Sequence, residues 1–444
     1  MQPQNKDSHF SKVNKRILAI AVPSILANIT TPLLGLVDTA IVGHMGSAVF
    51  IGAIAVGGVM FNMLYWLFSF LRGGTSGLAA QAYGAADTRT QALVLYRSLL
   101  VALGIGAAMI VLQWPLEWIL SHFVDPDADT AALAGLYFRI LIYGAPAVLA
   151  TYALSGWFLG MQNSRMLLIT SIAINLTNIA VSLILVYGAG WRIAGVAVGT
   201  LVAQWTGFFI GLTLLRRYRV KRPPLREIFN RHELGRFFRI NIDVMLRTVC
   251  LIAVTLWFTK LGARQGAVIL AVNTLLMQLF LLFSYMMDGF AFAAEALVGR
   301  FVGAAQWAEM RRCVRGVFGW GVALATVFTA AYFLLGEAFL GILSADTDVI
   351  SASADYYWWA AVVPFAGFAA FAWDGVFLGA TLTRQLLLSM AGAMVTFFTV
   401  YLLLSSILGN HALWLAFIAY LAMRGALQTW MYFSHQFVST PPRQ

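Results

Sequence analysis

Long apolar stretches recur along the whole chain and are separated by short polar segments. A helix needs about 20 predominantly apolar residues to cross the hydrocarbon core of a bilayer. The pattern therefore predicts twelve transmembrane helices, six in each half of the chain. They are expected near residues 17–43, 49–71, 93–113, 133–160, 166–187, 192–215, 242–260, 267–290, 314–336, 354–380, 386–408 and 412–437.

The composition narrows the class of protein further. Of the 444 residues, 61% are hydrophobic and 11% are charged, and the mean hydropathy is +0.81. Soluble domains average about 25% charged residues, so this chain cannot cover the water-facing surface of a soluble domain. A secreted protein, a cytosolic enzyme and a nucleic-acid-binding domain are excluded. The expected fold class is an all-α integral membrane protein.

The basic residues are distributed unevenly between alternate loops. If the N-terminus is cytoplasmic, most of the 29 Lys and Arg residues fall in cytoplasmic segments, and the external segments hold Arg192, Lys260 and Arg264. Lys and Arg accumulate in the cytoplasmic loops of membrane proteins. The distribution therefore predicts that both termini are cytoplasmic. It also indicates that the net charge of +11 reflects basic residues at the membrane surface and not a nucleic-acid-binding site.

The most basic segment lies near the middle of the chain. Residues 216–240 contain nine Lys and Arg residues and the pair Pro223-Pro224. Basic clusters beside membrane spans are attracted to anionic lipid headgroups, so we interpret this segment as a cytoplasmic linker that rests on lipid. A nucleic-acid or regulatory-protein site is the alternative. The linker divides the chain into predicted lobes over 1–215 and 241–444.

The two halves resemble each other at a shared offset of 219 residues. The sequence FLG at 158–160 recurs at 377–379, and YGAAD at 83–87 aligns with VGAAQ at 302–306. Because each half holds an even number of predicted spans, the repeat is parallel, about an axis along the membrane normal. This organisation is typical of transporters with a binding site between two lobes, whereas a channel more often surrounds its pore with identical subunits.

Asp38 is the clearest ionisable residue within a predicted span of the first half. One face of that helix, at 3-4-3 spacing, carries Asn28, Thr31, Gly35 and Asp38. Pro32 lies in the same run and can bend the helix. A carboxylate in the bilayer is costly and is a candidate proton carrier. The alternative is a structural Asp that hydroxyl groups of a neighbouring helix satisfy.

Further polar positions lie on other spans of the first half. Ser171, Asn175, Asn178 and Ser182 follow 4-3-4 spacing on the fifth predicted span. Interhelical hydrogen bonding explains any one of them, but several such stripes favour a wet cavity. The expected lining residues of this substrate cavity are Asn62, Asn175, Ser182, Thr200 and Gln204.

In the second half, charged residues concentrate toward the predicted cytoplasmic side. Asp243 and Arg247 are four residues apart on one helical face and are expected to pair. Asp288 and Glu295 also share a face, and Asp374 lies in the tenth span. We expect a buried network with excess negative charge, which a cation or protons must neutralise. Structural pairing is the alternative, and Glu295 could instead be solvated near the interface.

Motifs for enzymatic chemistry are absent from the sequence. The two cysteines give no disulfide framework, and the six histidines are dispersed without zinc spacing. No phosphate-binding loop or nucleophile elbow is present. We therefore expect no cofactor and no enzymatic activity, and an ion gradient as the source of energy.

Several motifs together resemble the multidrug and toxic compound extrusion (MATE) family, and its DinF-like branch in particular. The resemblance covers nearly the whole chain, although each motif alone is weak. The motifs are VDTAIVGHMG at 37–46, AQAYGAAD at 80–87, NIDVMLR at 241–247, AVNTLLM at 271–277, MDGFAFAAEA at 287–296 and DGVFLGAT at 374–381.

The resemblance implies an antiporter that expels lipophilic cationic compounds in exchange for protons or sodium, with a V-shaped cleft between two six-helix lobes. Asp38 matches the first-span acid that the family uses for proton coupling, and Asn178 matches a fifth-span Asn of the same site. Where the family often has a further acid, this chain has Ser182. The charged residues of the second half, Asp243 to Asp374, match the pattern of the branch.

The same resemblance implies a multi-pass protein of the bacterial cytoplasmic (inner) membrane. Its expected partners are small organic cations and membrane lipids, without nucleic acid, and the expected state is a monomer. A lipid or lipid-linked precursor flippase is the alternative transport function, as is sodium coupling. The acidic balance of the polar residues disfavours a diphosphate lipid, which would need buried Arg or Lys.

Overall fold

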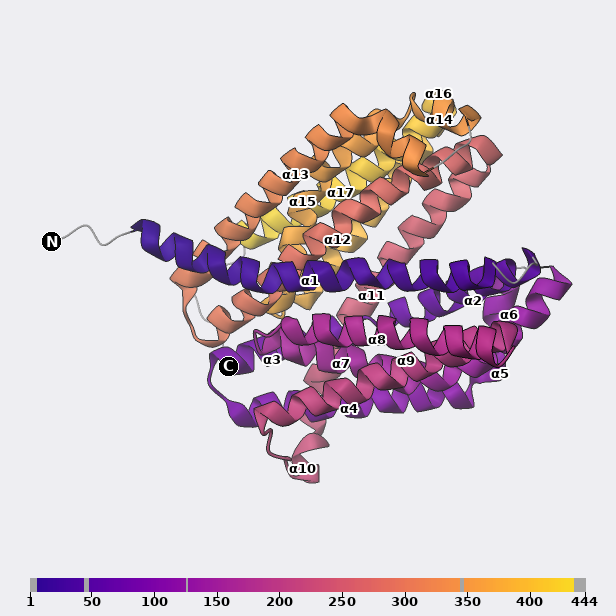
Figure 1. Cartoon of the computed structure of the whole chain (residues 1–444). Coiled ribbons are helices and arrows are strands. Elements are labelled where there is room, and N and C mark those ends of the chain that lie inside the picture. Colours follow the sequence, from indigo (N-terminus) through magenta and orange to yellow (C-terminus); the bar gives the residue numbers. More distant parts are fainter. Residues whose placement is uncertain (1–5, 44–47, 125–126, 344–346, 435–444) are drawn as a thin grey trace. The chain divides into compact units, whose positions relative to one another are not determined.

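The computed structural model describes residues 6–43, 48–124, 127–343 and 347–434, which are almost entirely helical (Figure 1). Within these residues, twelve helical segments are long and apolar enough to cross a membrane, which confirms the predicted all-α class. In chain order the elements are α1 (Lys6–Gly43), α2 (Ala48–Leu67), α3 (Phe70–Gly84), α4 (Thr88–Val111), α5 (Gln113–Val124), α6 (Ala128–Leu141), η1 (Ile142–Gly144), α7 (Ala145–Gly160), α8 (Arg165–Leu183), η2 (Ile184–Gly188), α9 (Arg192–Leu215), η3 (Arg216–Tyr218), α10 (Leu225–Ile228), α11 (Arg231–Ala263), α12 (Ala267–Gly303), α13 (Trp307–Leu343), α14 (Thr347–Ser353), α15 (Tyr357–Gly379), α16 (Thr383–Leu408) and α17 (Asn410–Ser434).

Two helical segments lie outside the spans that the sequence predicts: most of α3, and α5. The second span was expected to end at residue 71, but α3 continues it to Gly84. The extension is rich in small and polar residues, and most of its side chains are buried. Helix α5 falls between candidate spans. Residues 44–46 of the motif at 37–46, and both chain ends, lie outside the described residues.

Two acidic residues define where helices begin. Asp87 precedes α4, and its carboxylate accepts a hydrogen bond from the Thr90 amide at 3.0 Å. Asp127 precedes α6 and accepts from the Thr130 amide at 3.0 Å. The first amides of a helix have no partner within the helix, so a side-chain acceptor at this position stabilises the start. Both polar segments are therefore compatible with short loops between spans.

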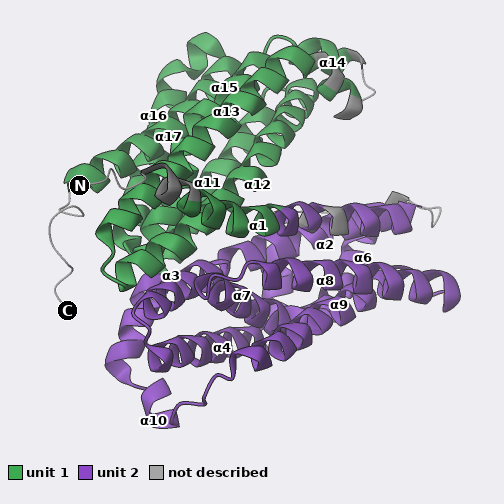
Figure 2. Cartoon of the chain, turned by 60° about the vertical axis from the view of Figure 1, so that its left-hand side comes forward, with its two compact units in different colours: residues 1–25, 242–444 green, residues 26–241 purple. Residues whose placement is uncertain are grey.

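The helices form two compact units (Figure 2). Unit 1 comprises residues 1–25 and 242–444, and unit 2 comprises residues 26–241. Helices α1 and α11 each contribute residues to both units. The first part of α1 packs within unit 1, where Ile25 lies against Gly289. The boundaries predicted at 216 and 240, and the cleft expected between the lobes, stay predictions.

Unit 2 has an aromatic core within a bundle of paired helices. Helix α8 packs along α9, and α3 and α4 both pack against α7. In the core, the ring of Phe61 contacts Tyr65, Tyr137 and Phe138, with centroid distances of 5.3, 6.4 and 5.0 Å. Such edge-on and offset ring pairs are favourable in buried regions. Tyr137 of this core also lies beside the polar cluster described below.

Unit 1 combines an aromatic core with a satisfied polar pair. Helices α12 and α15 pack together, as do α16 and α17. The Phe258 ring contacts the rings of Trp414 and Phe417, with centroid distances of 5.2 and 5.3 Å. The buried amides of Asn273 and Asn410 donate to each other at 2.8 and 2.9 Å, and the Trp414 indole donates to Asn273 at 2.8 Å. Mutual pairing removes much of the cost of burying these amides.

The internal repeat is visible in the helix packing. In unit 2, a Cβ atom on Gly156 of α7 would lie 2.3 Å from the carbonyl oxygen of Arg72 on α3. In unit 1, a Cβ on Gly375 of α15 would lie 2.1 Å from the carbonyl oxygen of Ala291 on α12. Both the glycines and their partners are separated by the offset of 219 found in the sequence. The same close approach of two backbones is therefore built twice.

The turns that follow these helices repeat as well. Gln162 after α7 and Thr381 after α15 have φ values of 65° and 57°. Ala86 after α3 and Ala305 after α12 have φ values of 56° and 54°. Left-handed backbone is uncommon for residues other than glycine, and each pair again follows the offset of 219. These correspondences confirm the predicted parallel repeat.

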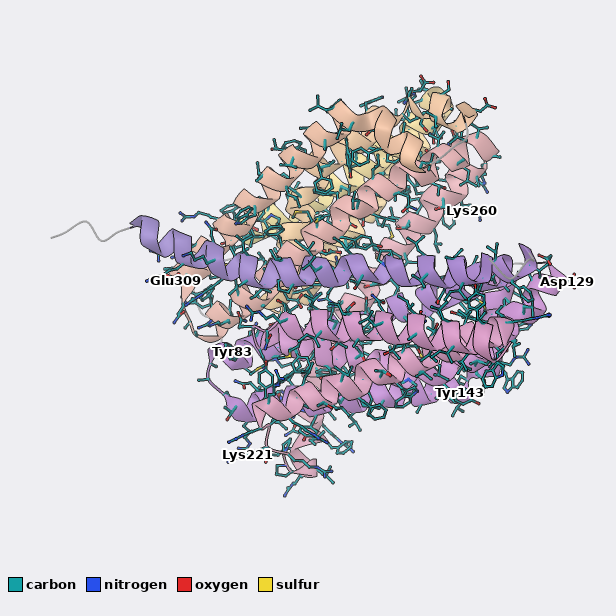
Figure 3. All side chains as sticks on the ribbon, viewed as in Figure 1. Tyr83, Asp129, Tyr143, Lys221, Lys260 and Glu309 are labelled. Atoms are coloured by element: carbon teal, nitrogen blue, oxygen red, sulfur yellow. The ribbon has the colours of Figure 1, made fainter. Side chains whose placement is uncertain are left out.

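Charged residues mark opposite ends of the helices within each unit. In unit 2, Lys221 of the basic segment and Asp129 in the first turn of α6 lie near opposite ends (Figure 3). In unit 1, Glu309 and Lys260 do the same (Figure 3). This agrees with loops that alternate between two sides of a membrane. The assignment of the basic side to the cytoplasm stays a prediction.

Candidate functional site

The candidate coupling residue Asp38 lies on α1 and is buried, with 5% of its surface exposed. Thr200 of α9 donates a hydrogen bond from Oγ1 to Asp38 Oδ2 at 3.4 Å. Asn178 of α8 donates from Nδ2 to Thr200 Oγ1 at 2.8 Å. Three helices of unit 2 therefore place the two predicted coupling residues around one shared hydroxyl group. We call Asp38, Asn178 and Thr200 the carboxylate cluster.

The carboxylate cluster holds more acceptors than donors. The Thr200 hydroxyl has one proton and can direct it to Asp38 Oδ2 or to the Val196 carbonyl, which lies at 3.0 Å. Asp38 Oδ1 and Asn178 Oδ1 are buried and have no hydrogen-bond partner among the described residues. A buried acceptor without a donor costs free energy. The cluster is therefore chemically suited to receive a proton or a small cation.

Tyr137 of α6 is a further polar residue beside the cluster. It is buried, and its hydroxyl group lies near enough to interact with Thr200 and with the Asp38 charge. The sequence analysis did not assign it a role. A polar ring within an otherwise apolar span was the available signal, but such residues are common in helix packing.

The remaining polar stripe of α8 faces α1. The hydroxyl groups of Thr30 and Ser171 lie 2.5 Å apart, and Asn175 donates from Nδ2 to the Thr30 carbonyl at 3.0 Å. Interhelical hydrogen bonding, the alternative considered from the sequence, therefore accounts for Ser171 and Asn175. Helix–helix hydrogen bonds of this kind hold membrane helices together.

The other predicted cavity residues are dispersed over unit 2. Asn62 of α2 is exposed, and Gln204 of α9 lies against Gly144, where an added Cβ would be 1.7 Å from its Oε1 atom. Ser182 of α8 is fully buried beside Gly199. The role of these residues, with Asn175 and Thr200, as a substrate cavity stays a prediction.

A second buried site lies in unit 1 and is centred on Asp374 of α15. Its Oδ2 atom accepts hydrogen bonds from Arg247 of α11 and Arg424 of α17. Gln428, one turn beyond Arg424, donates to Oδ1 at 2.8 Å. Arg424 and Asp374 are 2% and 6% exposed. A buried carboxylate is tolerated when paired and hydrogen-bonded in this way.

The expected pairing of Asp243 with Arg247 is wrong. Arg247 instead pairs with Asp374, and Asp243 accepts a hydrogen bond from Thr383 Oγ1 at 2.8 Å. The i,i+4 spacing brings the first two side chains to one face, but an acid from α15 meets the guanidinium group directly. Tertiary packing therefore decides the partner.

Two acids of α12 complete the charged site. Asp288 and Glu295 lie close enough to interact with the charge of Arg247. Glu295 is 1% exposed, so the alternative that it is solvated near the interface is wrong. We call Asp288, Glu295 and Asp374, with the two arginines, the charged network. The network so defined holds three acids and two arginines, of which the sequence analysis counted Arg247 alone, and its expected excess of negative charge stays a prediction.

Arg424 and Gln428 are the residues of this network that the sequence analysis missed. An arginine in the middle of the last span was a signal, because an intramembrane charge needs a partner. Its partner could not be read from spacing, since Asp374 lies on another helix.

Among the described residues, no group of three or more His, Cys, Asp or Glu side chains could hold a metal ion.

Comparisons with known proteins agree with this architecture. The sequence model of the MatE family matches residues 23–184 and 240–404. DNA damage-inducible protein F of Escherichia coli is 37% identical over 415 residues, which cover 93% of this chain and 90% of that protein. A probable multidrug resistance protein NorM of Deinococcus radiodurans is 27% identical, with 93% of each chain covered.

Solved structures share the fold. A structure of the Vibrio cholerae MATE transporter VcmN superposes with a TM-score of 0.87 at 15% identity, covering 97% of this chain and 99% of that chain. An outward-facing multidrug resistance MATE family transporter gives a TM-score of 0.86 at 18% identity, covering 96% of this chain and 97% of that chain. At this identity the likeness establishes the fold alone.

Proposed function

The chain belongs to the multidrug and toxic compound extrusion family, and from this premise we propose that it exports lipophilic organic cations in exchange for protons by alternating access. Family membership identifies the chain as a multi-pass membrane transporter of the efflux type and not an enzyme. The proposal adds the coupling ion, the substrate class and the residues that carry them. It also places the protein in a bacterial cytoplasmic membrane with both termini inside.

The excess of acceptors in the carboxylate cluster is the observation that carries the proposal. Asp38 forms no ion pair with another described residue, and its Oδ1 atom and that of Asn178 lack donors among them. A proton on Asp38 would remove the buried charge and supply one donor. The hydrogen bonds through Thr200 would then rearrange, because the carboxyl group could donate instead of only accept.

Proton binding must favour one conformation over another if it is to drive transport. Asp38 lies six residues after Pro32 on α1, and Pro32 removes one backbone hydrogen bond from that helix. A change in the hydrogen bonds at Asp38 therefore acts on a helix whose backbone hydrogen bonding is already weakened at Pro32. We propose that protonation biases the bend of α1 at Pro32.

The charged network supports a cationic substrate. Asp288, Glu295 and Asp374 outnumber the two arginines of the network, so its balance is acidic when all are ionised. An organic cation compensates such an excess, whereas a diphosphate lipid would need uncommitted basic groups. Arg247 and Arg424 are both committed to Asp374. These contacts favour drug-like cations over the flippase alternative.

Sodium coupling would use the same oxygen atoms. Carboxylate, amide and hydroxyl oxygens are ligands that hard cations accept, and the carboxylate cluster contains all three kinds. The two ions differ in their dependence on the imposed gradient, so transport measurements distinguish them directly.

The test is transport of a lipophilic cationic dye by the purified protein in liposomes. A pH gradient is imposed first, with sodium absent, and a sodium gradient is then imposed at equal pH. The proposal predicts dye movement with the pH gradient, abolished by a protonophore, and background movement with the sodium gradient. Dye movement that requires sodium and ignores the pH gradient would reject proton coupling.

A further inference from the structure

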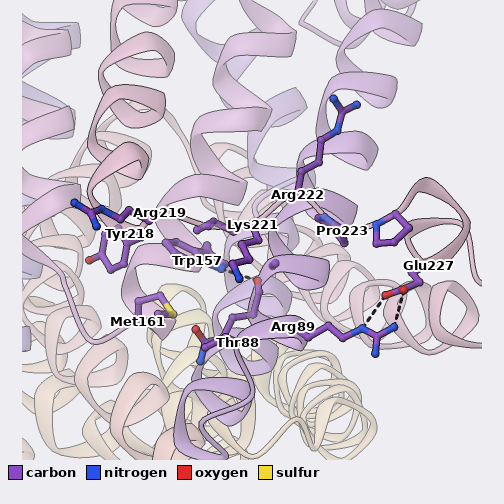
Figure 4. Close-up of a pocket in the computed structure, with 14 residues that line it drawn as sticks. Thr88, Arg89, Trp157, Met161, Tyr218, Arg219, Lys221, Arg222, Pro223 and Glu227 are labelled. Atoms are coloured by element: carbon purple, nitrogen blue, oxygen red, sulfur yellow. Dashed lines mark hydrogen bonds and ion pairs between the residues drawn. The ribbon is translucent and has the colours of Figure 1, made fainter.

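A pocket of about 370 Å³ lies within unit 2 where the basic segment meets the helices (Figure 4). Its walls come from the start of α4, the end of α7, and residues 218–224 that follow α9. It is separate from the carboxylate cluster, since it contains neither Asp38 nor its partners. Neither the repeat nor the coupling chemistry requires it.

The pocket carries an excess of positive charge. Arg219, Lys221 and Arg222 line it and are exposed, and they form no ion pair with another described residue. The carboxylate that lines the pocket, Glu227, accepts two hydrogen bonds from Arg89 at 2.9 and 2.6 Å. This pairing holds the pKa of Glu227 below its usual range. Three cations are thus left for a ligand.

The floor of the pocket is apolar and fixed in place. Trp157 is 1% exposed, and its indole donates to the Gln91 carbonyl at 2.9 Å. The Tyr218 ring lies edge-on to Trp157 at 5.1 Å, and Met161 lies beside them (Figure 4). A flexible thioether next to aromatic rings provides an adaptable apolar contact. The pocket therefore combines a basic rim with an apolar floor.

The outer wall is attached to α4 by a buried arginine. Arg97, 6% exposed, donates to the carbonyl oxygens of Glu227 at 2.7 Å and Ile228 at 3.2 Å. Together with the Arg89–Glu227 pair, this anchors α10 beside the start of α4. Charge-assisted hydrogen bonds of this kind are stronger than neutral ones. The pocket is thus built by specific contacts and does not arise from a loose loop.

Exposed apolar residues adjoin the basic rim. Leu225 and Phe229, at either end of α10, are 60% and 54% exposed, and the intervening Arg226 is also exposed. Basic and large apolar side chains side by side are typical of segments that lie in the headgroup region of a membrane. A soluble phosphate compound would not require these apolar side chains, whereas a lipid would contact them.

We propose that this pocket binds the phosphate headgroup of an anionic phospholipid from the adjoining leaflet. Lys221 contacts the headgroup phosphate, Arg219 and Arg222 lie on either side of it at the rim (Figure 4), and the glycerol and upper acyl carbons lie over Met161 and Trp157. Leu225 and Phe229 enter the same leaflet and keep the pocket at the membrane surface. The inference concerns a lipid site on the basic segment and does not depend on which ion drives transport.

The test is lipid binding to the purified full-length protein, freed of endogenous lipid in neutral detergent, by native mass spectrometry. Phosphatidylglycerol is titrated against phosphatidylcholine. The first variant carries Arg219→Gln, Lys221→Gln and Arg222→Gln. Its control carries the same loss of charge at three basic residues of the segment that do not line the pocket, through the substitutions Arg216→Gln, Arg217→Gln and Arg231→Gln.

The expected result is that the first variant weakens the tightest phosphatidylglycerol site by about tenfold or more, while the control changes it by less than about threefold. Equal weakening by both variants would mean diffuse attraction to the basic segment and would overturn the pocket. A third variant, Met161→Glu, places a carboxylate on the apolar floor and should weaken the site without removing any basic residue. Thermal unfolding of each variant verifies that it is folded.

Soluble competitors distinguish the two sources of phosphate. Glycerol 3-phosphate and inorganic phosphate carry the anionic group without acyl chains, so they should displace phosphatidylglycerol poorly at millimolar concentration. Displacement by either compound at the concentration of the lipid itself would identify a soluble phosphate ligand and overturn the lipid assignment. No transport is measured, so failure here is independent of failure of the antiport proposal.

Discussion

At the scale of single residues, the buried acids Asp38 and Asp374 have opposite surroundings. Asp374 is held by Arg247, Arg424 and Gln428, so its charge is compensated in the folded protein. Asp38 contacts neutral groups, and one of its oxygens has no partner among the described residues. A compensated acid suits a structural or substrate-balancing role, whereas an uncompensated one suits reversible protonation.

The pairing around Asp374 can be tested by a double-mutant cycle. Asp374→Asn and Arg424→Gln should each reduce the free energy of unfolding by about 3 kcal/mol, because each leaves buried charge without its partner. Together they should cost at least about 1 kcal/mol less than the sum of the single changes. The measurement is denaturant unfolding in mixed micelles.

Asp243→Asn and Arg247→Gln provide the control cycle. These residues share a helical face but bind different partners, so their coupling energy should be the smaller of the two. A larger coupling in the control cycle, or strict additivity for Asp374 and Arg424, would contradict the observed pairing.

The sequence could predict those site residues that helical spacing alone places on one polar face. Asp38 and Asn178 were found because their helices carry polar residues on one face, and the structure brings both to Thr200. Their part in coupling is still a prediction. Arg424 was not assigned to the site, because its partner comes from a helix about 50 residues earlier in the chain, and no local pattern encodes that contact.

At the scale of helices, the molecule depends on close backbone approach at matched glycines. Gly156 and Gly375 occupy equivalent positions of the repeat, and each has a carbonyl oxygen where a Cβ atom would lie. Small residues let membrane helices approach closely enough for extensive van der Waals contact. The repeat therefore preserves a packing requirement in both units, while the charged residues differ between them.

Gly375→Ala should be strongly destabilising. The new methyl group would lie 2.1 Å from the Ala291 carbonyl oxygen, so α12 and α15 would have to move apart. Overpacking of this kind costs about 2 kcal/mol or more, and we expect a lower unfolding temperature in detergent. Gly319→Ala is the matched control, since a Cβ there meets nothing within 4 Å and alanine favours helix. Equal stability of the two variants would contradict the packing described for α15.

The helices themselves were largely predictable, because apolar length is a direct requirement of the bilayer. The exception is instructive: residues 72–84 contain glycine, serine and glutamine and were expected to lie outside a span, yet α3 continues through them. Their side chains are buried by helices packed around them, which hydropathy along the chain cannot reveal. The repeat offset of 219, in contrast, could be found from the sequence, because the tripeptide FLG at 158–160 recurs at 377–379.

At the scale of the whole molecule, the alternating ends of the helices make a prediction about topology. The basic segment, which includes Arg226, should be cytoplasmic, because Lys and Arg accumulate in cytoplasmic loops. Arg264 lies at the other end of α11, between α11 and α12, and should therefore be external. In a background with Cys250 and Cys313 replaced by serine, single Arg226→Cys and Arg264→Cys variants are exposed to an impermeant thiol reagent. Intact cells should label only the second, and permeabilised cells should label both.

Rapid labelling of Arg226→Cys in intact cells would invert the topology. The charge argument from the sequence would then fail for the whole chain, and the basic segment would face the opposite leaflet. The family assignment would be unaffected, since it rests on sequence similarity and fold.

The central claim is that a proton on Asp38 drives export, and the most direct measurement compares two Asp→Asn variants in liposomes. Asp38→Asn removes the buried carboxylate, and Asp129→Asn makes the same chemical change at an exposed site within α6. Dye efflux driven by an imposed pH gradient should fall to background for Asp38→Asn and stay at the wild-type rate for Asp129→Asn, whose side chain lies in the exposed first turn of α6. Both proteins should unfold cooperatively and still bind the dye. Full proton-driven efflux by Asp38→Asn would contradict the account and move the coupling site to Asp288 and Asp374.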